Sequence, residues 1–137
     1  PVIYTRESFL DRVKEITNGE GVPVVYDSVG KDTWEGSLNS LRKMGMMVSF
    51  GNASGAVDPF PPGMLAAKGS LFLTRPTLMD YTAKREDLLA TANELFEVVS
   101  SGAVKIEINQ TYPLAEAAQA HRDLEARKTT GSTILLP

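Results

Sequence analysis

The apolar residues of this chain follow two patterns that alternate along the sequence. Continuous apolar runs over residues 22–28, 46–50 and 70–74 predict strands that are buried on both faces of a parallel sheet. Apolar residues recur at helical spacing over residues 9–16 and 34–45, and this spacing predicts two helices. Strands and helices that alternate with short turns predict a right-handed parallel α/β sheet.

Residues typical of caps and turns stand at the ends of these elements. Gly19 and Gly45 are expected to end the two helices, because glycine is favoured just beyond a helix. Asp32 and Glu35 have the spacing of a capping box, which predicts that Asp32 is the N-cap of the second helix. The short apolar stretch at residues 2–4 predicts the end of one more strand.

The pattern changes in the last third of the chain. A long amphipathic helix is expected over residues 84–101, a second helix over residues 113–127, and a short final strand over residues 133–136. Residues 104–108 alternate strictly between apolar and polar, so we expect a strand with one solvated face in an antiparallel or edge position. This strand differs in kind from the earlier ones and suggests a second structural region.

Composition narrows the classes of protein to which the chain can belong. Its 137 residues are about the length of one domain, and its net charge of −3 argues against nucleic acid as a partner. No apolar stretch approaches the roughly 20 residues that span a bilayer, so we expect no membrane association and a cytoplasmic location. The absence of cysteine excludes disulfides and thiolate chemistry, and a single histidine argues against a metal site.

Two strand ends carry the small residues that a ligand site at a sheet edge requires. In parallel α/β sheets, ligands bind outside the carboxyl ends of the strands. Residues 27–30 and 49–53 follow predicted strands and contain glycine and small polar side chains. Such sequences suit a nucleotide site, but they equally suit ordinary strand-to-helix turns. No G-x-G-x-x-G phosphate loop occurs in the chain.

Single side chains also have two interpretations each. Tyr4 could stack on an adenine or reach a ribose phosphate, or it could be a half-buried tyrosine at the start of a helix. Thr77 and Leu78 could line the same crevice or form an ordinary loop. His121 is expected to be a packed, hydrogen-bonded histidine. Because Ser28 has no neighbouring histidine and no acid–base pair is evident, we expect no catalytic residue and no metal ligand in this chain.

Four stretches, taken in order and with their spacing, resemble one family. They are residues 25–34, 48–55, 68–71 together with 74–76, and 112–132. Together they are similar to the zinc-independent, zeta-crystallin-like quinone oxidoreductases of the medium-chain dehydrogenase/reductase superfamily. The resemblance implies an enzyme that transfers hydride from NADPH to a quinone or a similar electron-poor acceptor.

The same resemblance implies a domain division and a set of cofactor contacts. Residues 1–103 would form an incomplete Rossmann-type NADPH-binding domain, and residues 104–137 a segment that returns to a GroES-like catalytic domain. By resemblance, Tyr4 would lie by the adenosine 2′-phosphate and Val29 by the adenine or ribose. The nicotinamide half would lie on Phe50, Gly51, Asn52 and Ala53, and its carboxamide would be flanked by Pro76, Thr77 and Leu78. Arg127 would reach back towards the cofactor from the C-terminal segment.

Against the family template the chain is expected to be a C-terminal fragment without catalytic activity of its own. It would begin at the end of the third Rossmann strand, which leaves the strand at residues 22–28 with an unpaired edge. Because such an edge invites pairing, and because in this family the strand near residues 71–74 tends to pair across a two-fold axis, we expect a homo-oligomer such as a dimer. Two alternatives stay open: a zinc-independent enoyl or alkenal reductase, and a non-catalytic dimerisation or binding module.

Overall fold

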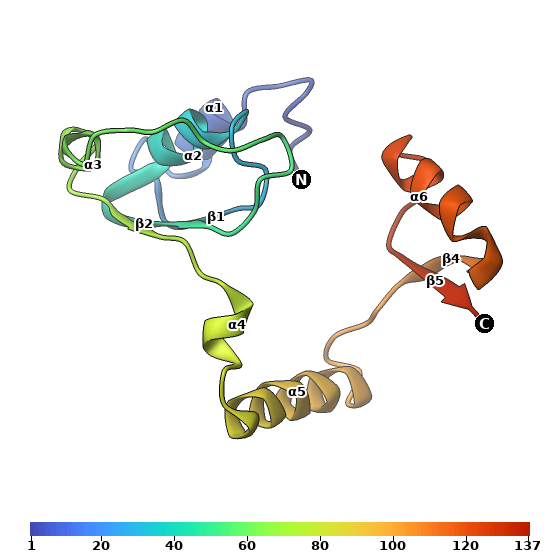
Figure 1. Ribbon diagram of the computed structural model, residues 1–137. Coiled ribbons are helices and arrows are strands. Elements are labelled where there is room, and N and C mark those ends of the chain that lie inside the picture. Colours follow the sequence, from blue (N-terminus) through green and yellow to red (C-terminus); the bar gives the residue numbers. More distant parts are fainter. The chain divides into compact units, whose positions relative to one another are not determined.

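The structure is a computed structural model that describes residues 1–137 (Figure 1). The chain divides into two units. The first unit is Pro1–Asp80 and the second is Tyr81–Pro137. None of the helices in either unit combines the length and the apolar character that crossing a membrane requires.

A three-stranded parallel sheet organises the first unit. Its order is β1-β2-β3, formed by Val22–Asp27, Leu41–Ser49 and Phe72–Thr74. The carboxyl ends of the three strands therefore lie at the same edge, with β2 in the middle. The predicted parallel α/β sheet is confirmed.

Short helices connect the strands of the first unit. Helix α1 (Phe9–Ile16) is capped by Ser8, whose hydroxyl accepts the Asp11 N–H at 3.2 Å. The remaining helices of this stretch are short: α2 (Trp34–Asn39), α3 (Gly63–Ala67) and α4 (Leu78–Tyr81). The last of these begins at Leu78, one of the two residues for which an ordinary loop was one interpretation.

The core of the first unit lies on one face of its sheet. Leu38 of α2 and Met47 of β2 are almost fully inaccessible, with 1% and 0% of their surface exposed. Trp34 packs beside them, and its ring lies 5.1 Å from that of Phe60. The buried cluster is completed by Leu41 and Leu71. This side of the sheet is filled as the apolar pattern predicts.

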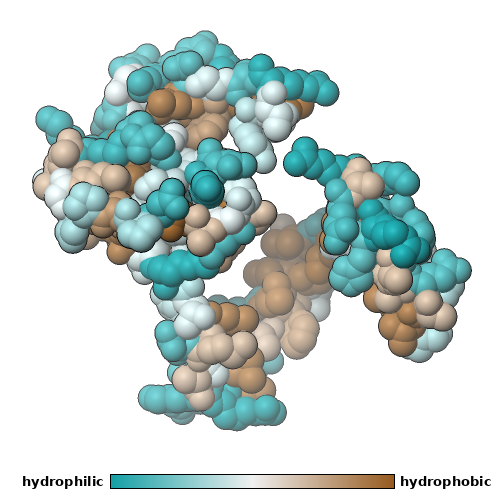
Figure 2. Space-filling model, turned by 45° about the horizontal axis from the view of Figure 1, so that its top comes forward, coloured by the Kyte–Doolittle hydropathy of each residue, from teal (hydrophilic) through white to brown (hydrophobic).

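The other face of the same sheet is open. Val24, Met46 and Phe72 lie side by side in register on neighbouring strands, and their exposed fractions are 39%, 40% and 57%. Tyr26, two residues further along β1, is 73% exposed. Apolar surface is visible among the polar surface in Figure 2. The prediction of strands buried on both faces is therefore wrong for this sheet, because its helices cover one face.

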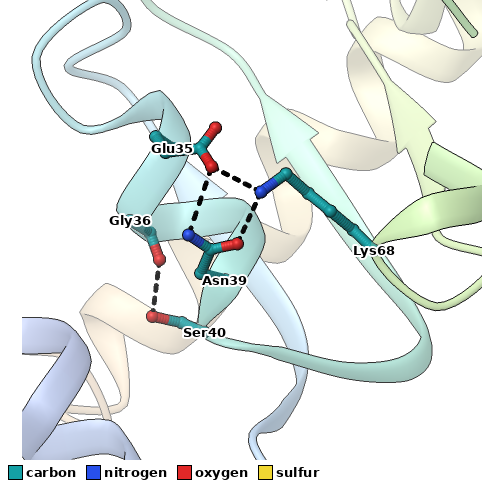
Figure 3. A network of polar contacts seen from close by, with 5 residues as sticks. All are labelled: Glu35, Gly36, Asn39, Ser40 and Lys68. Atoms are coloured by element: carbon teal, nitrogen blue, oxygen red, sulfur yellow. Dashed lines mark hydrogen bonds and ion pairs between the residues drawn. The ribbon is translucent and has the colours of Figure 1, made fainter. Parts of the chain in front are cut away.

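A polar network on the surface joins α2 to the end of α3 (Figure 3). The Lys68 ammonium donates to Glu35 Oε1 at 2.5 Å and to Asn39 Oδ1 at 2.6 Å. The hydrogen bond from Lys68, followed by its charge, holds the pKa of the Glu35 carboxyl below its usual range despite partial desolvation. Beside them, the Ser40 hydroxyl donates to the Gly36 carbonyl at 2.8 Å. The network fixes the end of α2 at the point where the chain turns into β2.

This early end of α2 corrects the prediction of a helix over residues 34–45. The Ser40 carbonyl accepts the N–H of Val22 at 2.9 Å, and Leu41 already pairs with Val22 across the sheet. Met44 has a left-handed φ of 57° and donates its N–H to Gly69 at 2.8 Å. These bonds to Val22 and Gly69, which are distant in sequence, therefore decide the structure after residue 40, and the helical spacing of the apolar residues does not.

Two further expectations for the first unit are wrong. The N-cap of α2 is Thr33 and makes no side-chain cap bond, so the capping box of Asp32 and Glu35 does not form. Glu35 binds Lys68 instead, while the Thr33 hydroxyl is held by Asp27. Residues 2–4 form no strand, because no other strand lies beside them to complete a ladder.

The second unit contains one long helix and a small helix-and-strand motif. Helix α5 spans Arg85–Ser100, close to the predicted bounds. Strand β4 (Ile108–Pro113) pairs in parallel with β5 (Ser132–Leu136), which confirms the predicted final strand. Between them lie the 3₁₀ turn η1 (Leu114–Glu116) and helix α6 (Ala117–Glu125).

The predicted strand over residues 104–108 and helix over residues 113–127 are shifted in the structure. Strand β4 begins at Ile108, opposite Ser132, so the residues before it have no strand to pair with. Pro113 ends that strand, and the α-helix starts only after the 3₁₀ turn. His121, expected to be packed and hydrogen-bonded, is exposed beside an apolar pocket of 180 Å³. Ladder geometry, which sequence periodicity does not encode, sets these bounds.

Candidate functional site

A buried carboxylate stands at the end of β1 and organises the turn that follows. Asp27 is 4% exposed. Its Oδ1 accepts the backbone N–H of Val29 at 2.8 Å and of Gly30 at 2.9 Å. Its Oδ2 accepts the hydroxyls of Thr33 at 2.8 Å and Ser37 at 2.6 Å. One side chain thus joins the strand end, the turn and the start of α2.

Two opposing effects act on the ionisation of Asp27. Burial favours the neutral acid and is the largest single effect on its pKa. The hydrogen bonds from Ser37, Gly30, Thr33 and Val29 favour the carboxylate, and together they outweigh burial, so the pKa lies below its usual range. The side chain is therefore a carboxylate at neutral pH.

The turn after β2 is built on the turn after β1. The Ala53 N–H donates to the Ser28 carbonyl at 3.2 Å, and the Ser54 N–H donates to the Val29 carbonyl at 2.8 Å. The Ser54 hydroxyl donates to the same Val29 oxygen at 2.8 Å. The Phe50 N–H donates to the Asp27 carbonyl at 2.9 Å. Residues 28–30 and 50–55 therefore form one hydrogen-bonded double turn.

Glycine is required where the two turns touch. A Cβ on Gly51 would lie 2.3 Å from the Ser28 carbonyl oxygen, a distance that real side chains do not reach. Gly30 has a φ of 89°, and a Cβ there would lie 2.7 Å from the Gly55 carbonyl oxygen. The backbones thus approach as closely as they can, which exposes the Phe50–Ala53 segment at the sheet edge.

The third strand end is tied to the second by a guanidinium. Arg75, directly after β3, donates from Nη1 to the Ser49 carbonyl at 2.8 Å. Pro76 is half-buried, whereas Thr77 and Leu78 are exposed at the start of α4. The segments after all three strands therefore lie together at one edge of the sheet.

A pocket lies against the first of these turns. It has a volume of 250 Å³, and Tyr4, Phe9 and Val29 contribute to its walls. Tyr4 is 50% exposed, and Asp27, Thr33 and Ser37 lie at the same pocket. An aromatic wall beside a strand-end turn is a suitable surface for a planar ring.

The predicted cofactor residues of the first unit lie in three places near the carboxyl ends of its strands. Tyr4 and Val29 share the pocket, Phe50 to Ala53 form the second turn, and Pro76 to Leu78 follow the third strand. Arg127 belongs to the second unit, where it follows α6 with a left-handed φ of 57° and is exposed.

Asp27 was predicted only as part of the candidate segment 27–30, and Arg75 was given no role of its own. The signal for Asp27 was present, because an aspartate before a short turn often bonds the amides two and three residues on. The bond from Arg75 to Ser49 crosses between strands, and no local pattern indicates it.

No metal centre is formed by the residues of this chain. Nowhere in residues 1–137 do three side chains of the metal-binding types come together. The residues present do not supply the ligand set of a zinc ion, which takes four ligands, or three and a water.

Comparison with known families identifies the chain. A family model described as "Zinc-binding dehydrogenase" matches residues 1–135, nearly the whole length. The chain belongs to the zinc-binding dehydrogenase family. The family description names zinc, whereas no three side chains of zinc-binding types come together in residues 1–137.

Relatives within the zinc-binding dehydrogenases are named for reductase activities. The chain is 56% identical to a quinone oxidoreductase of Pseudomonas aeruginosa over 98% of its own length and 41% of the relative. It is 44% identical to a 2-haloacrylate reductase of a Burkholderia species, over 98% of the chain and 40% of that protein. The resemblance to quinone oxidoreductases is confirmed.

A solved structure shares the fold. The crystal structure of Escherichia coli quinone oxidoreductase complexed with NADPH superposes with a TM-score of 0.93 at 51% identity, covering 99% of this chain and 42% of that one. The chain thus spans about two fifths of the length of the relatives it matches.

Proposed function

We propose that the chain forms part of an NADPH-dependent quinone oxidoreductase and corresponds to the C-terminal part of such an enzyme. The double turn at the carboxyl ends of β1 and β2 carries this proposal, since it is the place where α/β sheets bind dinucleotides. A relative with 51% identity has been crystallised with NADPH, and a relative with 56% identity is named a quinone oxidoreductase.

The residues at the sheet edge would hold the cofactor in sequence along its length. Tyr4 and Val29 would contact the adenosine end, because they form walls of the same pocket. Phe50 to Ala53 would lie under the nicotinamide half, where Gly51 lets the backbone approach closely. Pro76 to Leu78 would flank the carboxamide, and Arg127 would reach the cofactor from the C-terminal segment.

NADPH, when bound, would supply the hydride. We assign no side chain of this chain as an acid or a base, and the proton that completes the reduction would come from solvent. The contribution of these residues is to orient the nicotinamide and to exclude water. The double turn suits this role because its backbone groups are held by hydrogen bonds before any ligand arrives.

The chain supplies only part of a dinucleotide site. A glycine-rich phosphate loop, whose amides hold a pyrophosphate at a helix N-terminus, does not occur in residues 1–137. We therefore propose that the chain alone binds NADPH weakly and does not turn over. Residues 1–103 would be an incomplete Rossmann-type domain, and residues 104–137 would return to a catalytic domain.

Three further properties belong to the same proposal. The enzyme would work without zinc, which the lack of cysteine supports for this chain. It would be cytoplasmic. It would form a homodimer, which is supported by the edge positions of β1 and β3 in the sheet.

A second candidate function is reduction of an electron-poor alkene. It is favoured by the 44% identity to a 2-haloacrylate reductase, whose substrate by name carries a carbon–carbon double bond. Hydride delivery by the cofactor is common to both candidates. The third possibility is a binding or dimerisation module that uses no cofactor, and the NADPH titration below separates it from both reductase candidates.

Titration of NADPH into the full chain, followed by nicotinamide fluorescence with NADH as reference, tests the proposal. We expect weak but saturable binding that prefers NADPH. Gly51→Ala should weaken it by about tenfold or more, since the new Cβ opens the double turn. Gly63→Ala is the matched control, because a Cβ there meets nothing within 4 Å. A folded chain that binds no NADPH even at millimolar concentration would leave only the module.

A further inference from the structure

Asp27 is a buried anion without a cationic partner. It is 4% exposed, and its four hydrogen bonds all come from neutral donors, two amides and two hydroxyls. None of the ion pairs in residues 1–137 includes it. Burial of a carboxylate is costly unless its oxygens accept hydrogen bonds. The four donors must therefore stay close to Asp27, and the carboxylate fixes where they lie.

Those four donors decide the shape of the first turn. Val29 and Gly30 direct their N–H groups inwards to Oδ1, which leaves the Ser28 and Val29 carbonyl oxygens to face the second turn. Thr33 and Ser37 anchor Oδ2 to α2, so the carboxylate cannot swing away from the strand end. The Asp27 carboxylate thus fixes the first turn to the end of β1 and to α2.

No buried carboxylate holds the second turn as Asp27 holds the first, and the bond within it runs from the Gly55 N–H to the Asn52 carbonyl at 3.0 Å. Ala53 and Ser54 donate their amides to the carbonyls of Ser28 and Val29, and Gly51 packs on the Ser28 backbone. A shift of the Ser28–Gly30 segment would therefore move the acceptors on which residues 50–55 depend.

We propose that Asp27 is a positioning residue that fixes both strand-end turns, the second one through the first. Its importance for the cofactor rests on the function proposed above, because Phe50 to Ala53 are the segment assigned to the nicotinamide half. Asp27 itself need not touch the cofactor.

The chemistry of the four bonds makes the proposal specific. In Asp27→Asn, the amide oxygen can accept from Val29 and Gly30, while the amide nitrogen donates to the two hydroxyl oxygens, whose protons are free to rotate. Asparagine can therefore reproduce all four contacts without charge. In Asp27→Ala all four donors lose their acceptor, and the turn loses its anchor.

Amide hydrogen exchange of the full chain, resolved residue by residue, tests this inference without any ligand. Asp27→Ala should accelerate exchange of the Ala53 and Ser54 amides by about tenfold or more relative to the core amide of Met47. Asp27→Asn should stay within roughly threefold of the wild type. Asp58→Ala, at an exposed aspartate in the 51–62 loop, is the matched control and should change neither.

Three results would overturn the inference. One is unchanged exchange at Ala53 and Ser54 in Asp27→Ala. Another is equal acceleration at Met47, which would mean that the whole unit unfolds and the turns have no separate anchor. The third is a failure of asparagine to rescue the exchange rates.

NADPH titration of the same variants then separates the two proposals. Accelerated exchange at Ala53 and Ser54 together with weaker NADPH binding in Asp27→Ala supports both. The same exchange pattern in a chain that binds no NADPH at all supports the role of Asp27 and contradicts the proposed cofactor function.

Discussion

The two compact units use their apolar residues in opposite ways. In Pro1–Asp80, side chains such as Leu38 and Met47 are inaccessible and form a continuous core. In Tyr81–Pro137, Ala120 is the one buried apolar residue, and the 16-residue helix α5 buries none of its own. Apolar spacing marks a helix equally well in both units, but it does not reveal whether the helix has something to cover.

The largest expected effect tests that contrast directly. Leu38→Ala should lower the free energy of unfolding of the first unit by about 2–5 kcal/mol, because it empties a filled core. Leu95→Ala, on α5, should change stability by no more than about 0.5 kcal/mol, since Leu95 is 56% exposed. Urea unfolding followed by circular dichroism measures both, and Trp34, the single tryptophan, reports the first unit alone. Equal losses of unfolding free energy in the two variants would mean that the apolar face of α5 is covered in solution. The contrast between the two units would then be wrong.

The second effect concerns acid. Because the pKa of Asp27 is lowered on folding, its contribution to stability is complete above the unfolded-state value of about 4 and is lost as the pH falls through the lower folded-state value. The wild type should therefore lose stability more steeply than Asp27→Asn as the pH falls below about 5. Trp34 fluorescence during urea unfolding at each pH measures the difference, with Asp58→Asn as control. Parallel curves for wild type and Asp27→Asn would contradict the prediction.

A smaller effect is expected at the surface of the same unit. The pair of Lys68 and Glu35 is worth about 0.2–1 kcal/mol, since Glu35 is largely exposed and salt screens the interaction. A double-mutant cycle of Lys68→Met and Glu35→Gln, read by urea unfolding, isolates this energy. It should shrink in high salt. A coupling that salt leaves unchanged would contradict the surface assignment.

In both units, the sequence predicts the elements that depend on local residues and misses the bounds that depend on distant ones. The strands of the first sheet and helix α5 follow from local runs and spacing, so the sequence indicates them. The end of α2 depends on Ser40 meeting Val22, and the start of β4 depends on Ser132 lying opposite Ile108. These are contacts between distant residues, and no local pattern encodes them.

The candidate site divides in the same way. The strand-end segments could be predicted because small residues and glycine follow apolar runs. The anchoring of both turns on Asp27 could not, since Thr33 and Ser37 reach its carboxylate only once α2 is in place.

The smallest effect lies in the second unit. The Tyr112 hydroxyl donates to Asp123 Oδ2 at 3.1 Å, and partial burial, followed by this bond and the nearby negative charges, raises the pKa of Tyr112. In an ultraviolet titration Tyr112 should ionise at a higher pH than a free tyrosine does. The difference curve between the wild type and Tyr112→Phe, which reports this residue alone, should therefore be shifted to alkaline pH. A difference curve without this shift would show that this contact does not persist.

The double turn also has a consequence for how this protein can vary. Its two halves are more than twenty positions apart in the chain, yet each supplies the surface on which the other rests. In a library of random variants selected for folding, substitutions at positions 27, 30 and 51 should therefore all be rare. A replacement in one half should be tolerated only when the other half also changes, so we expect the two segments to covary in evolution.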